Sequence, residues 1–419
     1  HLIAGYGYLF RGLAFTYLRG QTGPGINDVD LFYNNEMVSS SSIPFKESTN
    51  YNESSLSNKD LIELQQIETA SFLVLKNDSL VFEKYWDPHT SLTKTNSFSA
   101  SKSFVAFLIG IAIDEGYIES VEQYVSDFLP EFNRPKKARI TIKNLLSMSS
   151  GLNWEESGKN PYSDNAKAYY GKYLREHIKN LKVTSEPGKR FHYKSCDTQI
   201  LTYVLEQATG KTISDYMEEK IWSKIGPESN ALWSLDRKDG DEKGFCCFYA
   251  TSRDFAKIGQ LILNNGKWEG QQLIPTKFLK NAIKPEKSIL DKWYSLYSEK
   301  KEDTFDIDKI LLDDLNTPGY IAKIHELYND AIKGDEQKKS KFNKACKLIG
   351  LFNISKKEWE SSKKSKIGVT ENYISKKIDE RTKAKNSGNF VLADKIREEL
   401  LSKGIMIEDQ KGKTIWKIK

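Results

Sequence analysis

The chain has 419 residues, and this length favours two or three domains. Hydrophobic residues make up 38% and aromatic residues 12%, enough for ordinary buried cores, which excludes a chain that is disordered throughout. Residues 331–419 hold 23 Lys and Arg against 12 Asp and Glu, a net charge of +11, so the first 330 residues carry −5 of the total of +6. This basic part is either a solvated helical surface or a surface for a polyanion such as RNA.

Residues 1–30 are expected to form a separate N-terminal segment. Its stretch LIAGYGYLFRGLAFTYL (2–18) is apolar and aromatic but is interrupted by Arg11. Such a stretch is too short and too interrupted for a membrane span. It is either an amphipathic first helix or a remnant of an export signal or membrane anchor, and association with a membrane is expected only in the second case.

The next elements are expected between residues 31 and 292, after an irregular stretch that ends near residue 60. Apolar periodicity and turn residues predict a hairpin over 71–86, a buried helix over 97–116 that begins near Ser99, a short helix and Gly turn over 141–154, a helix that ends at Gly210, a helix over 212–226, and a helix, turn and short strand over 250–275. Beyond about residue 290 the chain changes to amphipathic helices rich in Lys and Glu. We therefore expect a domain boundary between about 290 and 308.

The four cysteines predict no metal site. Cys196, Cys246, Cys247 and Cys346 do not form a CxxC or Cys/His pattern. The adjacent pair, Cys246 and Cys247, is not expected to form a disulfide, and all four cysteines are expected to pack in the interior. No cofactor is predicted.

The first chemical pattern is Ser99-Ala-Ser-Lys102 at the start of the predicted buried helix. Residues at i and i+3 of a helix share one face, so the Lys102 amine can reach the Ser99 hydroxyl. A serine becomes a nucleophile when a base takes its proton, and a lysine in an apolar helix can act as that base. Tyr193 follows in a Pro-Gly setting, and its phenol is either a proton relay or a core tyrosine with a satisfied hydroxyl.

Four stretches together resemble the serine β-lactamase and penicillin-binding-protein superfamily, and within it the β-lactamase-related esterases and the 6-aminohexanoate-dimer hydrolases. They are SFSASKSFVAFLIGIAIDEGYI, ITIKNLLSMSSGL, EPGKRFHYKSCDTQILTYVLEQATG and ATSRDFAKIGQLILNNGKWEGQQLIP. The resemblance implies that Ser99 forms an acyl-enzyme, that Lys102 and Tyr193 transfer protons, and that Ser195 is the third residue of a Tyr-x-Ser motif. It implies a small ester, amide or lactam as substrate.

The same resemblance implies a third motif, K-T-G or H-x-G, on a strand whose backbone N–H completes the oxyanion hole. No such strand is recognisable after residue 275. We therefore expect a hydrolase domain over 31–292 that lacks its C-terminal strands. Losing one oxyanion donor lowers the rate by about 10²–10³, so impaired activity is expected as well.

The C-terminal part, 305–419, resembles the anticodon-binding region of cysteinyl-tRNA synthetase. The resemblance rests on LLDDLNTPGYIAKIHELYNDA (311–331) and on ENYISKKIDERTKAKNSGNFVLADKIREELLSKGIMIEDQKGKTIWKIK (371–419). It implies a tRNA partner and contacts by Arg381, Arg397, Asp409 and Trp416. Trp416 is otherwise a packing residue under the last hairpin, and Arg397 is otherwise half of a helix-surface ion pair with Asp394. The motifs H-I-G-H and K-M-S-K-S of the catalytic half are absent, so aminoacylation by this chain alone is excluded.

Together these readings predict an α+β chain: a truncated β-lactamase-like sheet with a helical subdomain, then an α-helical bundle and a small C-terminal module. The alternative to a serine hydrolase is a fragmentary synthetase tail that binds tRNA without aminoacylation. The resemblances point to different compartments, exported or periplasmic for the hydrolase part and cytoplasmic for the tail. We expect a chimera from joined or misassembled reading frames, with a natural fusion or a hybrid that fails to fold as the alternatives.

Overall fold

The computed structural model describes residues 6–283 except 159, residues 317–348, and residues 371–418 except 404, 411 and 412. The chain divides into two compact units. The first contains His1–Pro285 and Asp308–Lys323, and the second contains Glu286–Ile307 and Ile324–Lys419. The boundary predicted between about 290 and 308, and most of the predicted Asp-Asp-x-Asn-Thr-Pro motif, lie outside the described residues.

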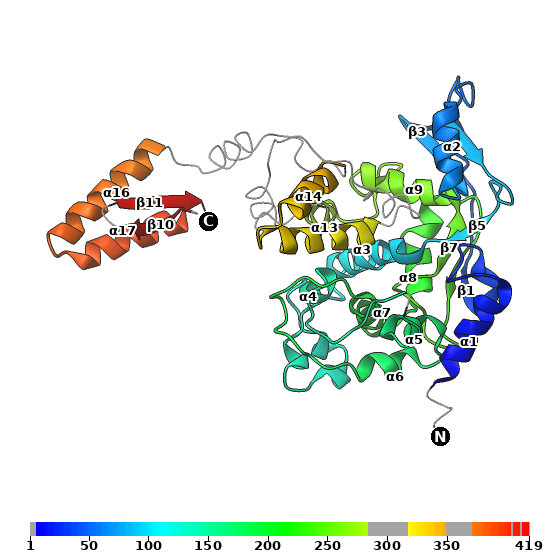
Figure 1. Cartoon of the computed structure of the whole chain (residues 1–419), viewed down its shortest axis with the longest axis horizontal. Helices are drawn as coiled ribbons and strands as arrows, with labels where there is room; N and C mark the ends of the chain where they lie inside the picture. Colours follow the sequence, from blue (N-terminus) through cyan, green and yellow to red (C-terminus); the bar gives the residue numbers. More distant parts are fainter. Residues whose placement is uncertain are drawn as a thin grey trace. The chain divides into compact units, whose positions relative to one another are not determined.

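The first unit contains ten described α-helices (Figure 1). They are α1 (Gly7–Phe15), α2 (Asn58–Gln66), α3 (Ser101–Asp114), α4 (Ile142–Leu146), α5 (Asp164–Tyr170), α6 (Leu174–Lys179), α7 (Ser195–Thr209), α8 (Ile213–Lys220), α9 (Ser252–Leu263) and α10 (Thr276–Ala282). Five of them, α3, α4, α7, α8 and α9, correspond to predicted helices. Helix α3 confirms the predicted buried helix, and α7 ends as predicted at Gly210, which has a left-handed φ of +69°.

The strands of this unit form three small sheets. They are β1 (Asn34–Met37), β2 (Lys46–Glu47), β3 (Ser71–Lys76), β4 (Ser79–Tyr85), β5 (Lys94–Asn96), β6 (Ala231–Ser234), β7 (Phe248–Thr251), β8 (Lys267–Trp268) and β9 (Gln271–Gln272). The main sheet has the antiparallel order β1-β6-β7-β5, and the others are β2-β4-β3 and β8-β9. The β3–β4 hairpin confirms the prediction for 71–86, since Asn77 and Asp78 both have positive φ in its two-residue turn. Within 6–283, no described strand follows β9.

Helix α3 is the centre of the core. Nearly every side chain from Phe104 to Ala112 is buried, and α7, α8 and α10 all contact this helix. Gly110 is required where α10 crosses, because a Cβ there would lie 2.4 Å from a ring carbon of Phe278. The serine predicted to be a nucleophile therefore precedes a helix that the surrounding core holds in place.

One cysteine prediction is wrong. Cys246 and Cys247 form a disulfide directly before β7, although adjacent cysteines were expected to stay apart. The backbone turns at this point, with a φ of +67° at Cys247, and this turn allows neighbouring side chains to meet. The other two cysteines, Cys196 and Cys346, are free and buried, as predicted.

The second unit contains the amphipathic helices predicted after residue 290. Its described elements are α13 (Thr317–Ala331), whose first residues belong to the first unit, α14 (Glu336–Leu348), α16 (Glu371–Asn386), α17 (Phe390–Ser402), β10 (Ile405–Gln410) and β11 (Lys413–Ile418). Helices α16 and α17 pack against each other, and α17 contacts the β10–β11 hairpin. A small apolar cluster joins them, containing Ile374, Ile396, Leu400, Ile405 and Ile407, with Trp416 packed against it.

Candidate functional site

The structure brings Ser99 and Lys102 together. Ser99 lies in the short 3-10 turn η4 (Phe98–Ala100), and Lys102 lies in the first turn of α3. The Lys102 Nζ donates to the Ser99 Oγ at 2.8 Å, and it also donates to the Phe245 carbonyl oxygen at 2.8 Å. The second hydrogen bond holds the amine in one position, so the side chain stays directed at the serine.

The backbone before the nucleophile is held in an unusual conformation. Phe98 has a φ of +42°, which a residue with a Cβ adopts only when its surroundings impose it. The buried Asn96 side chain accepts a hydrogen bond from the Phe98 N at 2.8 Å, and the Ser97 N donates to the Phe248 carbonyl at 2.8 Å. Backbone strain of this kind is common next to reactive side chains. The surrounding packing holds a conformation that the segment would not keep by itself.

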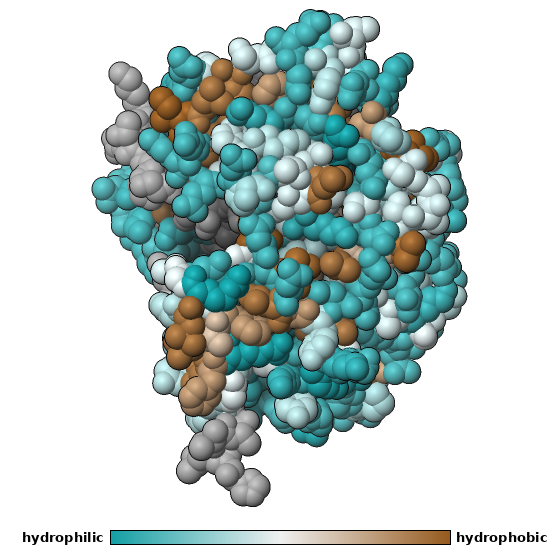
Figure 2. Space-filling model, turned by 90° about the vertical axis from the view of Figure 1, so that its right-hand side faces the viewer, coloured by the Kyte–Doolittle hydropathy of each residue, from teal (hydrophilic) through white to brown (hydrophobic). Residues whose placement is uncertain are grey.

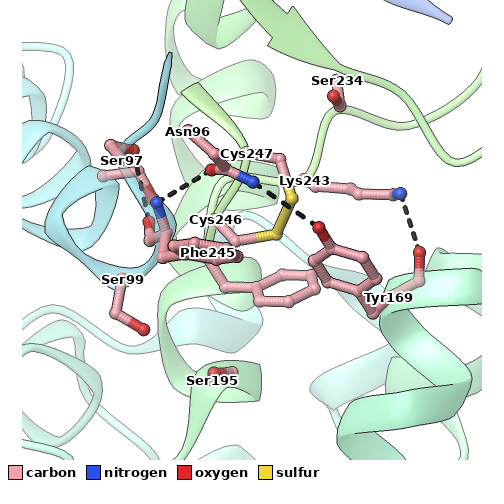
Figure 3. The surroundings of a disulfide bond; sticks show 12 residues. Asn96, Ser97, Ser99, Tyr169, Ser195, Ser234, Lys243, Phe245, Cys246 and Cys247 are labelled. Carbon is pink, nitrogen blue, oxygen red and sulfur yellow. Dashed lines mark hydrogen bonds between the residues drawn. A yellow bond between two sulfur atoms is a disulfide. The ribbon is translucent and has the colours of Figure 1, made fainter. Parts of the chain in front are cut away.

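The segment Gly244–Phe248 holds the residues before and after Ser99 in place, and Figure 3 shows part of it near Ser97. Its carbonyl oxygens accept from Ser101 at Gly244, from Lys102 at Phe245 and from Ser97 at Phe248. Gly244 is required where the segment passes α7, because a Cβ there would lie 1.9 Å from the Thr202 Oγ1. The sequence analysis did not identify this segment, since no local pattern in GFCCF indicates that its carbonyls bind a helix about 145 residues earlier.

Lys243 anchors the start of this segment. Its side chain is fully buried, its Nζ donates to the Tyr169 carbonyl at 2.8 Å, and the amine lies 3.5 Å from the centroid of the Phe32 ring. Burial lowers the pKa of Lys243 well below its ordinary value. The amine ties the segment to the end of α5, which Figure 3 shows beside the disulfide.

Tyr193 lies beside the same amine. The Lys102 Nζ is 5.2 Å from the centroid of the Tyr193 ring. The Tyr193 hydroxyl is buried, and it has no hydrogen-bond partner among the described residues. A buried hydroxyl without a partner is costly, so the alternative of a core tyrosine with a satisfied hydroxyl does not describe this side chain.

Ser195 begins α7, two residues after Tyr193. Its Oγ donates to the Glu156 Oε1 at 2.6 Å, and its backbone N donates to the Glu156 Oε2 at 2.7 Å. The same carboxylate accepts from the Trp154 Nε1 at 2.5 Å. Glu156 therefore caps α7 and accepts the hydrogen bond of the Ser195 hydroxyl. The sequence analysis missed this arrangement because the two residues are 39 positions apart.

A second carboxyl group lies in the first turn of α7. Asp197 is fully buried, and burial raises its pKa to about 7. The Ser150 Oγ donates to its Oδ1 at 2.6 Å. This group makes the start of α7 sensitive to pH, although the structure does not place it in contact with Ser99.

The predicted RNA-binding residues lie in two environments: some are paired or packed within the second unit, and one is exposed on a helix. Arg381 is 5% exposed and forms a two-fold ion pair with Asp409, at 2.9 and 3.0 Å. Trp416 packs against the apolar cluster, as its alternative interpretation predicted. Arg397 is exposed on α17. Among the described residues, no group of His, Cys, Asp and Glu is arranged to hold a metal ion.

Comparison with known proteins agrees with the β-lactamase-like fold. The first unit has a β-lactamase-like fold, similar to a Bacillus anthracis protein assigned as a 6-aminohexanoate-dimer hydrolase. The match covers 61% of this chain and 72% of that chain, with a TM-score of 0.54 and 23% identity. Residues 58–242 match the family model described as Beta-lactamase, so the chain contains a Beta-lactamase family domain.

The chain is also similar to proteins of a second class. The cysteine–tRNA ligase of Pelagibacter ubique is 48% identical over 136 residues, which are 32% of this chain and 30% of that protein. The corresponding enzyme of Gluconobacter oxydans is 44% identical over 107 residues, 26% of this chain and 23% of that protein. The chain thus spans a quarter to a third of the length of these relatives.

Proposed function

We propose that the first unit is a serine hydrolase that cleaves a small ester, amide or lactam through an acyl-Ser99 intermediate. The observation that carries this proposal is the 2.8 Å contact between the Lys102 amine and the Ser99 hydroxyl, beside the unpartnered Tyr193 phenol. The Beta-lactamase family domain supports the reaction class. The name of the B. anthracis protein is compatible with an amide substrate, and Ser195 in the Tyr-x-Ser motif favours an amide or ester over a lactam.

In the proposed reaction, the Ser99 oxygen attacks the substrate carbonyl carbon while the Lys102 amine, as general base, takes the hydroxyl proton. The Tyr193 phenol then relays a proton to the leaving alcohol or amine as the carbonyl–heteroatom bond breaks. Water attacks the acyl-serine by the reverse proton path and releases the acid. The helix dipole of α3 and the backbone N–H of Ser99 favour the negative charge that develops during both attacks.

We further propose that this activity is low, because the oxyanion hole would lack the donor that the expected third motif supplies. A single missing donor corresponds to a rate loss of about 10²–10³. Residues 284–316 lie outside the described structure, so the proposal rests on the sequence, in which no K-T-G or H-x-G follows residue 275.

Labelling of the full chain with a fluorophosphonate or a penicillin probe tests the reaction class. We expect a label on Ser99, identified by mass spectrometry, that is lost in Ser99→Ala and slowed at least a hundredfold in Lys102→Ala. Ser103→Ala is the matched control, because Ser103 lies on the same helix but its side chain is exposed. Absence of label from the folded wild-type chain, or equal labelling of Ser99→Ala, contradicts the proposal.

We propose a second, independent activity for residues 305–419, the binding of tRNA without aminoacylation. The similarity to cysteine–tRNA ligases and the net charge of +11 over residues 331–419 favour it. Of the four residues predicted for contact, Arg397 is the one with an exposed side chain that is also outside the Arg381–Asp409 pair and the apolar cluster.

Filter binding of tRNA at several salt concentrations tests this second activity. We expect Arg397→Ala to weaken binding and to reduce its salt dependence, because one phosphate contact is lost. Arg134→Ala, an exposed arginine of the first unit, is the control. Equal binding of an unrelated polyanion such as heparin, with no effect of Arg397→Ala, would reduce the activity to general charge attraction.

We propose that the two parts were joined between residues 292 and 305. The support is that a Beta-lactamase family domain and a similarity to cysteine–tRNA ligases occur in one chain, each over part of its length. Sequencing reads that cross codons 285–310 in a single molecule would establish a natural fusion, and reads that fail to cross them would establish an assembly artefact.

A further inference from the structure

Helix α1 carries an exposed apolar stripe on the face that turns away from the first unit. Phe10 and Leu13 share one side of the helix, Tyr6 is its N-cap residue, and Tyr17 begins the 3-10 turn η2 (Tyr17–Arg19) that follows it. Their exposed fractions are 49%, 65%, 46% and 66%, and the next residue, Leu18, is 75% exposed. Figure 2 shows a patch of hydrophobic residues over the N-terminal end of the described chain.

The opposite face of α1 is fixed to the protein. Tyr8 is buried, and the Arg11 guanidinium donates to the carbonyl oxygens of Tyr170 and Asp236 at 3.4 and 3.0 Å. Gly12 allows the close approach, since a Cβ there would lie 3.2 Å from the Tyr170 ring. The stripe is therefore held outward by an anchored helix and is not the outer side of a loose segment.

We propose that this stripe, defined by Tyr6, Phe10, Leu13, Tyr17 and Leu18, inserts into the surface of a phospholipid bilayer. Residues 6–18 contain no acidic residue, and their one charged side chain, Arg11, is turned inward. Tyrosines lie near both ends of the stripe, and tyrosine is the residue that places an apolar ring and a polar hydroxyl at a membrane–water interface. The adjoining Leu2-Ile3-Ala4 is also apolar in sequence.

The helix would lie in the interface and not cross it. Among the described residues, no helix is long and apolar enough to span a membrane. A short helix with an apolar face and an anchored polar face matches the geometry of interfacial helices. At about 200 Å² for each large apolar side chain, the exposed fractions of the five amount to roughly 600 Å², which is less than the ~800 Å² per partner of a standard protein interface. A second copy of the chain is therefore the less favoured occupant.

Apolar insertion, and not charge, is expected to drive the binding. The cavity beside α1 is lined by Arg11, Lys167 and Lys172, but also by Asp30 and Glu176, so its positive and negative charges come close to balance. Binding through apolar insertion can therefore be measured separately from binding through charge. The separation is needed because the basic C-terminal part would bind anionic vesicles for an unrelated reason. Neutral phosphatidylcholine vesicles at high salt exclude that contribution.

Flotation of the full chain with such vesicles tests the proposal. We expect wild type to float and the double variant Phe10→Ser and Leu13→Ser to lose at least tenfold in binding, since two inserted side chains are removed. Leu263→Ser is the control, because Leu263 is 82% exposed on α9 and lies outside the stripe. Unchanged thermal midpoints of both variants verify that they fold.

A second measurement keeps the proposal testable if the double variant fails to fold. In Phe10→Cys carrying an environment-sensitive dye, we expect the emission to shift to shorter wavelength with phosphatidylcholine vesicles, while the same dye at Leu263→Cys does not respond. Flotation that is equal in wild type and the double variant, or a dimer in sedimentation that the double variant dissociates while neither binds vesicles, would overturn the proposal.

Discussion

Replacing Tyr193 by phenylalanine separates a proton relay from a core tyrosine, because the structure predicts opposite changes in stability and activity. The Tyr193 hydroxyl is buried without a partner among the described residues, and such a group costs about 1–3 kcal/mol. Tyr193→Phe keeps the ring beside Lys102 and removes that cost. We expect the free energy of unfolding to rise by about 1 kcal/mol, which raises the melting temperature by about 2–4 °C in a domain of this size.

The same substitution removes the proposed proton relay. General acid–base catalysis by one positioned side chain contributes about 10²–10⁴ in rate, so labelling of Ser99 should slow by that factor. Calorimetry and the time course of probe labelling measure the two changes on one preparation. A lower melting temperature together with an unchanged labelling rate would show that Tyr193 is a structural tyrosine and would refute the reasoning.

Three further predictions concern groups that hold the site or the tail in place. Gly244→Ala should destabilise the first unit by about 1–3 kcal/mol and slow Ser99 labelling, because its Cβ would meet Thr202, and chemical denaturation measures the loss. Asp197 binds its proton more tightly in the folded chain than in the unfolded chain, so its contribution to stability falls as the pH rises from about 4 to about 7. Asp197→Asn should flatten that part of the profile of melting temperature against pH, and an unchanged slope would show that other groups cause it. Asp409→Asn should destabilise the α16–α17 and hairpin module by up to about 1 kcal/mol at pH 7, because the carboxylate that pairs with Arg381 is partly exposed. The pair holds the pKa of Asp409 well below its ordinary value, so the difference should shrink progressively as the pH falls below about 4, as measured by hydrogen exchange of residues 371–418.

Local patterns in the sequence predicted local structure. The apolar run after Ser99 predicted α3, Gly210 marked the end of α7, and Asn77-Asp78 marked the hairpin turn. The contact between Lys102 and Ser99 also followed from local geometry, since one helical turn separates them. Tyr193 was assigned by family resemblance alone, because no spacing rule brings a phenol from 91 residues later to that amine.

The contacts that the sequence did not reveal join residues far apart in the chain. Glu156 and Ser195 meet across 39 residues, and the Phe245 carbonyl reaches Lys102 across 143. Tertiary packing alone decides such pairs. The tail shows the same limit, since Arg381 and Asp409 were each predicted to contact RNA and the sequence did not reveal that they bind each other.

The dependence of the Ser99–Lys102 pair on the Phe245 carbonyl has a consequence for biosynthesis. The ribosome completes Lys102 long before it adds Phe245, so the nascent chain carries the serine and the lysine without the acceptor that aligns them. The amine gains its fixed position after the strand that begins at Phe248 has left the exit tunnel and joined its neighbours. A translation product that stops before that point would contain both reactive side chains and still lack their alignment.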